Sequence, residues 1–214
     1  MKNKPAFSPK NTARDTTRSK NSILSAALIE FSAHGHAGAR IDRIARQAKV
    51  SKPLIYAFFG NKDALYTAAL REAYVQIRVR EQALNLDEMD PENAIRALVR
   101  FTLQHFKSNP WFVSILNTEN LRGGKSIREI EDLAEIRSDV VNKLDKILQR
   151  GVQTGVFRAG VDPLNFYIAI ASLCFFPISN RYTLRTVFDC PIDDAWLEQK
   201  AEDAAEMALK FLYP

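Results

Sequence analysis

Hydrophobic residues recur every three or four positions along most of the chain, which is the spacing of an amphipathic α-helix. This pattern begins near residue 22 and returns, between turn signals, as far as the C-terminus. The alternation of apolar and polar residues that is typical of strands is absent. The pattern predicts about nine helices and no sheet, which is a fold of the all-α class.

Strong breakers divide the first part of this pattern into short helices. Gly35 ends the first helix, a second covers residues 41–48, and Ser51 is a good N-cap for a third that ends at Gly60. Tight turns join these helices, and the spacing of the second and third predicts a helix-turn-helix. The apolar face of the first helix consists of Ile23, Ala26, Ala27 and Phe31.

The later helices begin at recognisable caps. Asn61 can cap the next helix, and Asp90 and Asp162 each precede a proline that suits a first helical turn. Pro177 is placed to kink the helix that contains it. Helices are predicted over residues 62–84, 91–109, 111–121, 127–153, 163–182 and 193–212.

Charge is distributed unevenly along the 214 residues. Residues 1–80 contain 15 Lys and Arg against 5 Asp and Glu, whereas residues 81–214 contain 15 against 20. A basic N-terminal third is expected to attract a polyanion, with nucleic acid as the first candidate. Residues 1–20 have little to bury and are predicted to form a disordered basic arm.

Several functional classes have no support in the sequence. Two cysteines and three histidines make a disulfide framework or a metal site unexpected. The most apolar run, residues 166–178, is shorter than the ~20 residues of a membrane span, and no secretory signal is present. No phosphate loop, nucleophile elbow or zinc-protease motif occurs. We therefore expect no catalytic residues, no metal, no cofactor, no membrane contact and a cytoplasmic location.

The second helix of a helix-turn-helix enters the major groove of DNA, and here that helix covers residues 52–59. Its exposed positions should include Lys52, Pro53 and Tyr56. Lys and Tyr bind phosphate oxygens, and Lys also reads the guanine edge. Ser51 and Lys62 stand at helix N-termini, where backbone N–H groups favour a phosphate.

The segment GHAGARIDRIARQAKVSKPLIYAFFGNKDALY resembles the DNA-binding domain of TetR-family transcriptional regulators. The resemblance implies double-stranded DNA as a partner, a DNA-binding domain over residues 21–65, and an effector-binding and dimerisation domain over residues 66–214. It implies a homodimeric regulator, most often a repressor that a small molecule releases from its operator. The matching positions are Ala26, Ala27, Phe31, Gly35, Ile44, Ala45, Ala48, Val50, Ser51, Tyr56, Phe59, Lys62 and Leu65.

Three positions depart from that family's pattern. Ala39 stands where the family usually has Thr, so the neighbouring Arg40 is expected to reach the DNA backbone instead. Lys49 replaces a turn Gly, and a left-handed conformation there would cost roughly 1 kcal/mol. Phe58 removes one polar contact. The candidate DNA contacts are Arg40, Arg43, Ser51, Lys52, Pro53, Tyr56 and Lys62.

Polar residues inside apolar stretches of the C-terminal half need either protein partners or a ligand. Residues 116–124 are also similar to a segment of one subgroup of these regulators. An aromatic-walled pocket with His and Asn would suit a small planar molecule, neutral or anionic. Helix caps and ordinary core packing are the alternative role for the same residues. The pocket candidates are Phe101, His105, Trp111, Asn117, Asn120, Phe176 and Asn180.

The last two predicted helices are candidates for a dimer interface. One is apolar almost all round, and the other presents a row of alanines that lets a second helix approach closely. Pairing with two-fold mates would form a four-helix bundle and would require a near-palindromic operator. The interface candidates are Phe166, Ile170, Leu173, Ala201, Ala205 and Ala208.

Other functions remain open at this point. The same fold serves activators and regulators that need a co-repressor. A nonspecific architectural DNA-binding protein would have little use for a large acidic second domain. An enzyme would need a constellation such as His105 with Glu119 to act as an acid–base pair.

Overall fold

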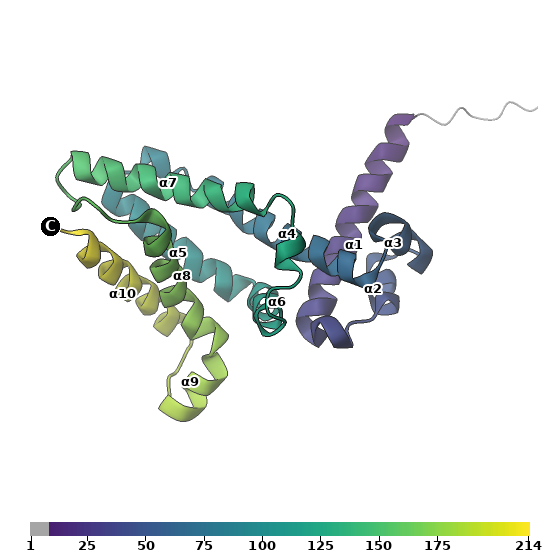
Figure 1. Ribbon diagram of the computed structural model, residues 1–214. Coiled ribbons are helices and arrows are strands. Elements are labelled where there is room, and N and C mark those ends of the chain that lie inside the picture. The colour runs from purple at the N-terminus through teal and green to yellow at the C-terminus, as the bar shows by residue number, and fades with distance from the viewer. Residues whose placement is uncertain (1–8) are drawn as a thin grey trace, which may run out of the picture. The chain divides into compact units, whose positions relative to one another are not determined.

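The computed structural model describes the backbone of residues 9–214 and the side chains of residues 15–136 and 140–214. Every regular element in that range is a helix, so the predicted all-α class is confirmed (Figure 1). The α-helices are α1 (Pro9–Gly38), α2 (Ile41–Ala48), α3 (Lys52–Phe59), α4 (Lys62–Gln82), α5 (Pro91–Ser108), α6 (Pro110–Leu121), α7 (Leu133–Gln153), α8 (Pro163–Ser179), α9 (Arg181–Phe188) and α10 (Asp194–Leu212), with short 3-10 helices η1 (Leu86–Glu88) and η2 (Ile127–Glu129).

The chain divides into two compact units. Unit 1 contains the described residues up to Ala73 together with Ile115–Ile130, and unit 2 contains Tyr74–Ser114 and Glu131–Pro214. The sequence predicts one division after residue 65, with everything later in the second domain. The structure instead groups segment 115–130 with the N-terminal helices. This grouping depends on contacts between residues far apart in the sequence, which local pattern does not reveal.

Helix α1 starts earlier than its apolar pattern does. It begins at Pro9, inside the segment predicted to be a disordered arm, while residues 1–8 of that arm lie outside the described residues. The residues from Asp15 to Asn21 are mostly exposed. Extending an existing helix avoids the cost of nucleation, so the extra turns need no apolar face. Gly35 breaks the helix as predicted, with φ 64° and ψ 177°.

The core of unit 1 is formed by the apolar faces of its short helices. Ile23 and Phe31 of α1, Ile44 of α2 and Ile55 of α3 are all buried, as is Leu65 at the start of α4. These residues are the ones whose spacing predicts the helix-turn-helix. The buried stripe therefore positions the opposite face of α3 outward.

Unit 2 is built around α5, which packs against α7, α8 and α10. The predicted caps at Asp90 and Asp162 are confirmed, because each side chain accepts a hydrogen bond from the backbone N–H three residues later. Asp193 caps α10 in the same way. A side-chain acceptor at this position satisfies one of the donors that a helix start leaves open.

Two predicted helices are divided in the structure. The segment over residues 163–182 becomes α8 and α9, which meet at an angle of 67° next to Asn180. Asn180 Nδ2 donates to the carbonyl of Phe176, which satisfies an acceptor at the end of α8. The helix predicted from residue 127 begins only at Leu133, after η2. No single described helix is long and apolar enough to cross a membrane, and only the bent pair of α8 and α9 together reaches that length.

Candidate nucleic-acid interface and ligand cavity

Helix α3 is fixed at its base and open along its outer face. Ser51 Oγ accepts a hydrogen bond from the Leu54 N–H at 3.4 Å, and Ile55 anchors the helix in the core. Lys52 and Pro53 are exposed, and Tyr56 is 41% exposed. The outward face therefore offers one amine, one phenol and apolar groups, which suit phosphate and thymine-methyl contacts.

Lys52 already has an acidic neighbour. Its Nζ lies 3.0 Å from Asp42 Oδ1 on α2, and hydrogen bonding to this carboxylate raises the pKa of the Lys52 amine. Both side chains are exposed, so the pair is weak and screened by salt. A DNA phosphate can replace Asp42 as the partner of Lys52.

Arg43 has a structural role in unit 1. Its Nε donates to Glu30 Oε1 at 2.6 Å, and its Nη2 donates to the Gly38 carbonyl at 2.9 Å. The backbone N–H of Arg40 donates to the same Glu30 oxygen at 2.8 Å. These bonds fasten the turn between α1 and α2, while the Arg40 residue stays exposed. Arg40 is therefore better placed than Arg43 to reach DNA.

The Glu30 carboxyl is the centre of this arrangement. It is 5% exposed, and burial alone would raise its pKa. The hydrogen bonds from Arg43 and Arg40 and the charge of Arg43 outweigh burial, so the pKa lies below its usual 4.5. A buried carboxylate with several donors is a strong local constraint on the backbone.

Lys62 is also engaged within the chain. Its Nζ donates to the Ala37 carbonyl at 3.2 Å, and the neighbouring Asp63 Oδ1 lies 2.7 Å from His36 Nε2. Asn61 Oδ1 accepts the Ala64 N–H at 2.8 Å, which confirms the predicted cap of α4. These contacts hold the start of α4 against the turn after α1. An incoming phosphate would still find the backbone N–H groups of this helix end.

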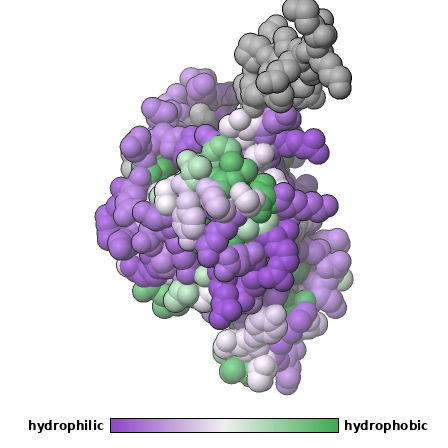
Figure 2. Space-filling model, turned by 90° about the vertical axis from the view of Figure 1, so that its right-hand side faces the viewer, coloured by the Kyte–Doolittle hydropathy of each residue, from purple (hydrophilic) through white to green (hydrophobic). Residues whose placement is uncertain are grey.

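Three further basic residues on unit 1 belong among the candidates. Arg46 and Lys49 are exposed at the end of α2, and Lys49 adopts a left-handed conformation, with φ 56°. Lys20 Nζ lies 5.4 Å from the centre of the Phe58 ring on α3. The charge excess of the N-terminal third is the signal that points to them. Figure 2 shows one face of the molecule, which is mostly hydrophilic with scattered hydrophobic areas.

Polar contacts hold segment 115–130 together and join it to α4 within unit 1. The fully buried Glu119 accepts the N–H groups of Ser126 and Ile127 at 2.5 and 3.2 Å. Arg122 lies 3.4 Å from Glu119 and stacks over the Tyr66 ring at 5.2 Å. Glu119 therefore holds a loop, and an acid–base role with His105 finds no support in these contacts.

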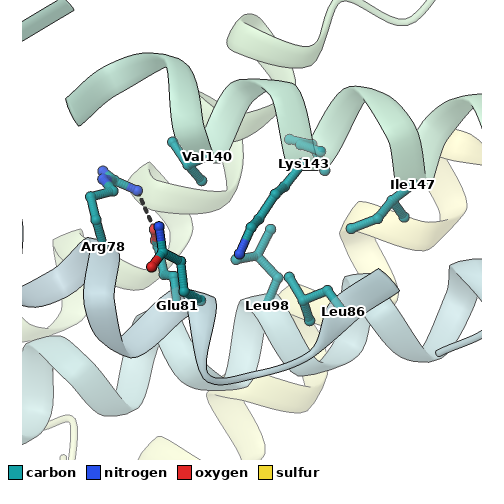
Figure 3. Close-up of a pocket in the computed structure, with 9 residues that line it drawn as sticks. Arg78, Glu81, Leu86, Leu98, Val140, Lys143 and Ile147 are labelled. Carbon is teal, nitrogen blue, oxygen red and sulfur yellow. Dashed lines mark hydrogen bonds and ion pairs between the residues drawn. The ribbon is translucent and has the colours of Figure 1, made fainter. Parts of the chain in front are cut away.

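Unit 2 contains a narrow cavity between α4, α5 and α7 (Figure 3). Its free volume is about 10 Å³, room for roughly one water molecule. Leu98, Val140 and Ile147 form part of its apolar wall, and the Lys143 side chain extends into it from α7. Arg78 pairs with Glu81 at its edge and donates to Tyr167 Oη at 3.1 Å.

His105 lies in an aromatic cluster of unit 2. Its ring centre is 5.1 Å from that of Phe112, 5.9 Å from Phe101 and 6.1 Å from Phe106. The residue is 3% exposed, and neither ring nitrogen has a hydrogen-bond partner among the described residues. Burial, with the charges of Arg80 and Arg78, lowers the pKa of this imidazole from 6.5 to about 4.

None of the seven pocket residues predicted from the sequence lines this cavity. The six besides His105 are distributed over the fold. Trp111 contacts the same cluster through Phe112, at 5.9 Å between ring centres. Phe176 is exposed, and Asn180 bonds to the end of α8. Asn117 and Asn120 belong to unit 1 and are exposed. Sequence reasoning missed Arg78, Glu81 and Lys143, because charged residues on long helices usually face solvent.

Comparison with known proteins agrees with this geometry. The family of bacterial regulatory proteins called the tetR family matches residues 23–69, and the family called Tetracyclin repressor-like, C-terminal domain, matches residues 91–207. The chain belongs to the TetR family.

Its relatives are transcriptional regulators. The chain is 37% identical to the HTH-type transcriptional repressor NicS of Pseudomonas putida over 85% of this chain and 86% of that protein. The fold is shared with SCO4942 of Streptomyces coelicolor, with a TM-score of 0.66, 24% identity, and coverage of 88% of this chain and 97% of that one. The fold is also shared with the transcriptional regulator FadR of Bacillus subtilis, solved in complex with stearoyl-CoA. The TM-score is 0.63 and the identity 20%, and the match covers 90% of this chain and 99% of that one.

The chain is thus a DNA-binding transcriptional regulator of the TetR family. Its α2 and α3 fall within the matched DNA-binding segment, as do the caps and turn that brace them. The match of the second family covers α5 to α9 and most of α10, which includes the aromatic cluster and the α5 and α7 walls of the cavity.

The predicted interface residues on α8 and α10 are mostly buried within unit 2. Phe166, Ile170, Ala201, Ala205 and Ala208 are buried inside the single chain, where they pack the helices of unit 2 together, and Leu173 is half-buried. Phe166, Ile170, Leu173 and Ala208 nevertheless line the groove between α8 and α10, so their part in a dimer interface stays a prediction. The large apolar residues exposed on these two helices are Leu164, Ile168, Phe176, Met207 and Phe211.

Proposed function

We propose that this TetR-family regulator is a repressor that binds a near-palindromic operator as a homodimer and leaves it when a small molecule occupies unit 2. The observation that carries the proposal is the outward face of α3. Lys52, Pro53 and Tyr56 are exposed there, while Ile55 on the opposite face is buried in the core of unit 1. The name of the Pseudomonas putida relative, a transcriptional repressor, supports the direction of regulation. A regulator of this kind works on chromosomal DNA, so we propose a cytoplasmic location.

We expect two kinds of DNA contact: phosphate contacts that position the protein on the duplex, and base contacts that read the sequence. The braced turn between α1 and α2 leaves Arg40 free to bind one strand's phosphates, and the N-terminus of α3 offers further donors. Lys52 and Tyr56 supply the polar contacts of α3, and its apolar groups suit thymine methyls. With so few polar groups on α3, affinity should depend strongly on phosphate contacts and hence on salt.

A homodimer follows from the apolar surface of α8 and α10. Exposed apolar side chains on both helices, with a groove of about 390 Å³ between them, leave a surface that a second copy can cover. Two copies related by a two-fold axis require an operator with two-fold symmetry. The expected spacing of the two α3 helices is about one DNA turn, ~34–36 Å, or a larger interval.

Release requires that the ligand bind one conformation more tightly than another. Both α4 and α6 contribute residues to each unit, so a ligand that repositions them in unit 2 also acts on chain segments of unit 1. The helix that starts at Lys62 is the element we expect to transmit the change. No catalytic step enters this proposal.

The test is fluorescence anisotropy of the protein on DNA from its own upstream region, with scrambled DNA as competitor. We expect nanomolar binding by two protomers per site and an affinity loss of about tenfold or more for Lys52→Ala with Tyr56→Phe. The control Lys146→Ala removes an exposed charge of α7 in unit 2 and should bind like the parent. Equal binding to operator and scrambled DNA would contradict the proposal.

The oligomeric state has its own test. Ile168→Glu with Met207→Glu places two charges on the exposed apolar face and should yield monomers in sedimentation velocity. Val79→Glu, at an exposed apolar position of α4, is the matched control and should remain dimeric. Reporter expression that falls when the gene is deleted would replace the repressor with an activator of the same fold.

A further inference from the structure

Three charged side chains meet at the cavity of unit 2: Arg78, Glu81 and the half-buried Lys143. Arg78 and Glu81 form an ion pair whose side chains are only 14% and 4% exposed. The Lys143 side chain enters the same cavity from α7, with its amine at the end facing α5 (Figure 3). Among the described side chains that line this cavity, Glu81 is the one carboxylate beside two cationic groups. Burying charge is costly unless it is paired, so this arrangement favours an anionic guest.

His105 supplies a second, independent observation. Both nitrogens of its buried ring have no hydrogen-bond partner among the described residues. Buried polar groups in native proteins are almost always bonded, and the exceptions commonly mark a functional role. A neutral imidazole offers one donor and one acceptor, and the surrounding Phe rings offer none of the complementary kind.

The cavity and the imidazole belong to one region of unit 2. Arg78 lines the cavity, and its charge also acts on the His105 ring. Leu98 lines the cavity from α5, and His105 follows seven residues later, about two turns along the same face of that helix. A guest that extends from Arg78 along α5 would therefore meet His105 and its aromatic neighbours.

We propose that this region binds a small aromatic carboxylate that carries a second polar atom on or in its ring. Arg78 and Lys143 hold the carboxylate, the rings of Phe101 and Phe112 face the planar body, and His105 bonds the second polar atom. This assignment rests on the proposed function, because it names the chemical class of the molecule that releases the operator. It assigns His105 as the residue that selects for the ring substituent.

The size of the cavity limits the guest. With about 10 Å³ free, even a single-ring ligand requires Lys143 and Arg78 to move aside, which their long flexible side chains allow. A long acyl chain would require the apolar wall of Leu98, Val140 and Ile147 to separate. We therefore expect this cavity to exclude long acyl chains such as that of the stearoyl-CoA bound by the Bacillus subtilis protein.

The binding test uses isothermal titration calorimetry on the full chain. The probes are the three hydroxybenzoates and the three pyridinecarboxylates, each with its matched amide, and stearoyl-CoA. We expect at least one carboxylate to bind, and its amide to bind at least about tenfold more weakly because the charge-assisted contacts are lost. Carboxylates that bind no better than their amides would overturn the proposal.

Variants locate the site. His105→Phe keeps an aromatic ring of similar size and should weaken carboxylate binding about tenfold or more while operator affinity stays unchanged. Lys143→Met keeps the length of the side chain and should weaken binding similarly, whereas Lys146→Met on the exposed side of α7 should have no effect. Unchanged carboxylate affinity in both His105→Phe and Lys143→Met would place the site elsewhere and refute the assignment.

The DNA assay separates this proposal from the proposed function. In anisotropy with operator DNA, the binding carboxylate should release the parent protein and should fail to release His105→Phe at the same concentration. Release by stearoyl-CoA and by none of the carboxylates would refute the ligand class and leave the ligand-responsive repressor intact. A parent protein that does not prefer operator DNA would refute the proposed function itself.

Discussion

Glu30 of unit 1 and His105 of unit 2 are both buried titratable side chains, yet their surroundings are opposite. Glu30 accepts hydrogen bonds from Arg43 and from the Arg40 backbone, and its pKa is lowered because those interactions outweigh burial. His105 has no hydrogen-bond partner among the described residues, and its pKa is lowered because burial disfavours its charged form. One group stabilises the fold in its ionised state, and the other is held neutral.

The comparison shows two different roles for a buried polar side chain. In unit 1 a satisfied carboxylate fixes the turn that positions the DNA-binding helices, so this unit is preorganised for a partner of constant shape. In unit 2 an unsatisfied imidazole retains a free-energy cost that a ligand can remove. We therefore expect substitutions at the two positions to change stability in opposite directions.

The largest effect is expected at His105. Between pH values of about 6.5 and 4 the unfolded chain binds a proton that the folded chain does not, so stability falls as the pH drops through this interval. A shift from 6.5 to about 4 corresponds to roughly 3 kcal/mol when complete. His105→Phe removes this loss and also the unsatisfied nitrogens.

Thermal unfolding across this pH range measures the effect. His105→Phe should raise the melting temperature by a few degrees near neutral pH, and the gain should grow as the pH falls toward 4. His34→Phe, at a more exposed histidine of unit 1, serves as the control for the loss of a histidine. A gain independent of pH would show that His105 is not held neutral in the folded chain.

The next effect is expected at Glu30. Glu30→Gln leaves Arg43 without its ion-pair partner and should cost about 2 kcal/mol of stability near neutral pH. The pKa of Glu30 is lowered, so its contribution is present above the ordinary pKa of 4.5 and is lost as the pH falls through the lowered value. Urea unfolding near neutral pH and in acid checks both statements.

The matched control for Glu30 is an exposed carboxylate of unit 2. Glu202 pairs with Arg100 at 2.5 Å on the surface, and Glu202→Gln should cost less than about 1 kcal/mol because solvent screens the pair. Equal losses for Glu202→Gln and Glu30→Gln would contradict the structural importance of the Glu30 contacts. Operator affinity should fall for Glu30→Gln alone, because only that substitution loosens the α1–α2 turn.

The smallest effect is expected at Lys49. This residue adopts φ 56° at the end of α2, where glycine has no steric penalty, so Lys49→Gly should stabilise unit 1 by about 1 kcal/mol. Arg46→Gly, inside α2, should destabilise by a similar amount because glycine weakens a helix interior. Urea unfolding distinguishes the two signs, and a loss of stability in Lys49→Gly would contradict the strain argument.

Much of unit 1 could be predicted from local sequence. The structure confirms the cap at Ser51 and the breaks at Gly35 and Gly60, which depend on interactions within a few residues. The candidate site was predicted less completely. Arg43 and Lys62 were predicted as DNA contacts, but in the structure both side chains form hydrogen bonds within the chain. Their partners lie 13 and 25 positions away in the sequence, so local pattern does not reveal these bonds.

The helical class, the helix caps and the motif of the DNA-binding segment follow from the order of the residues alone, because short-range hydrogen bonds and apolar spacing decide them. The tertiary structure decided which charged groups are buried. Arg78 and Glu81 look like a solvated pair on a long helix until α5 and α7 cover them. It also grouped segment 115–130 with unit 1 and left His105 without a hydrogen-bond partner among the described residues. Burial and pairing depend on which helix faces meet, and that is settled by contacts between distant parts of the chain.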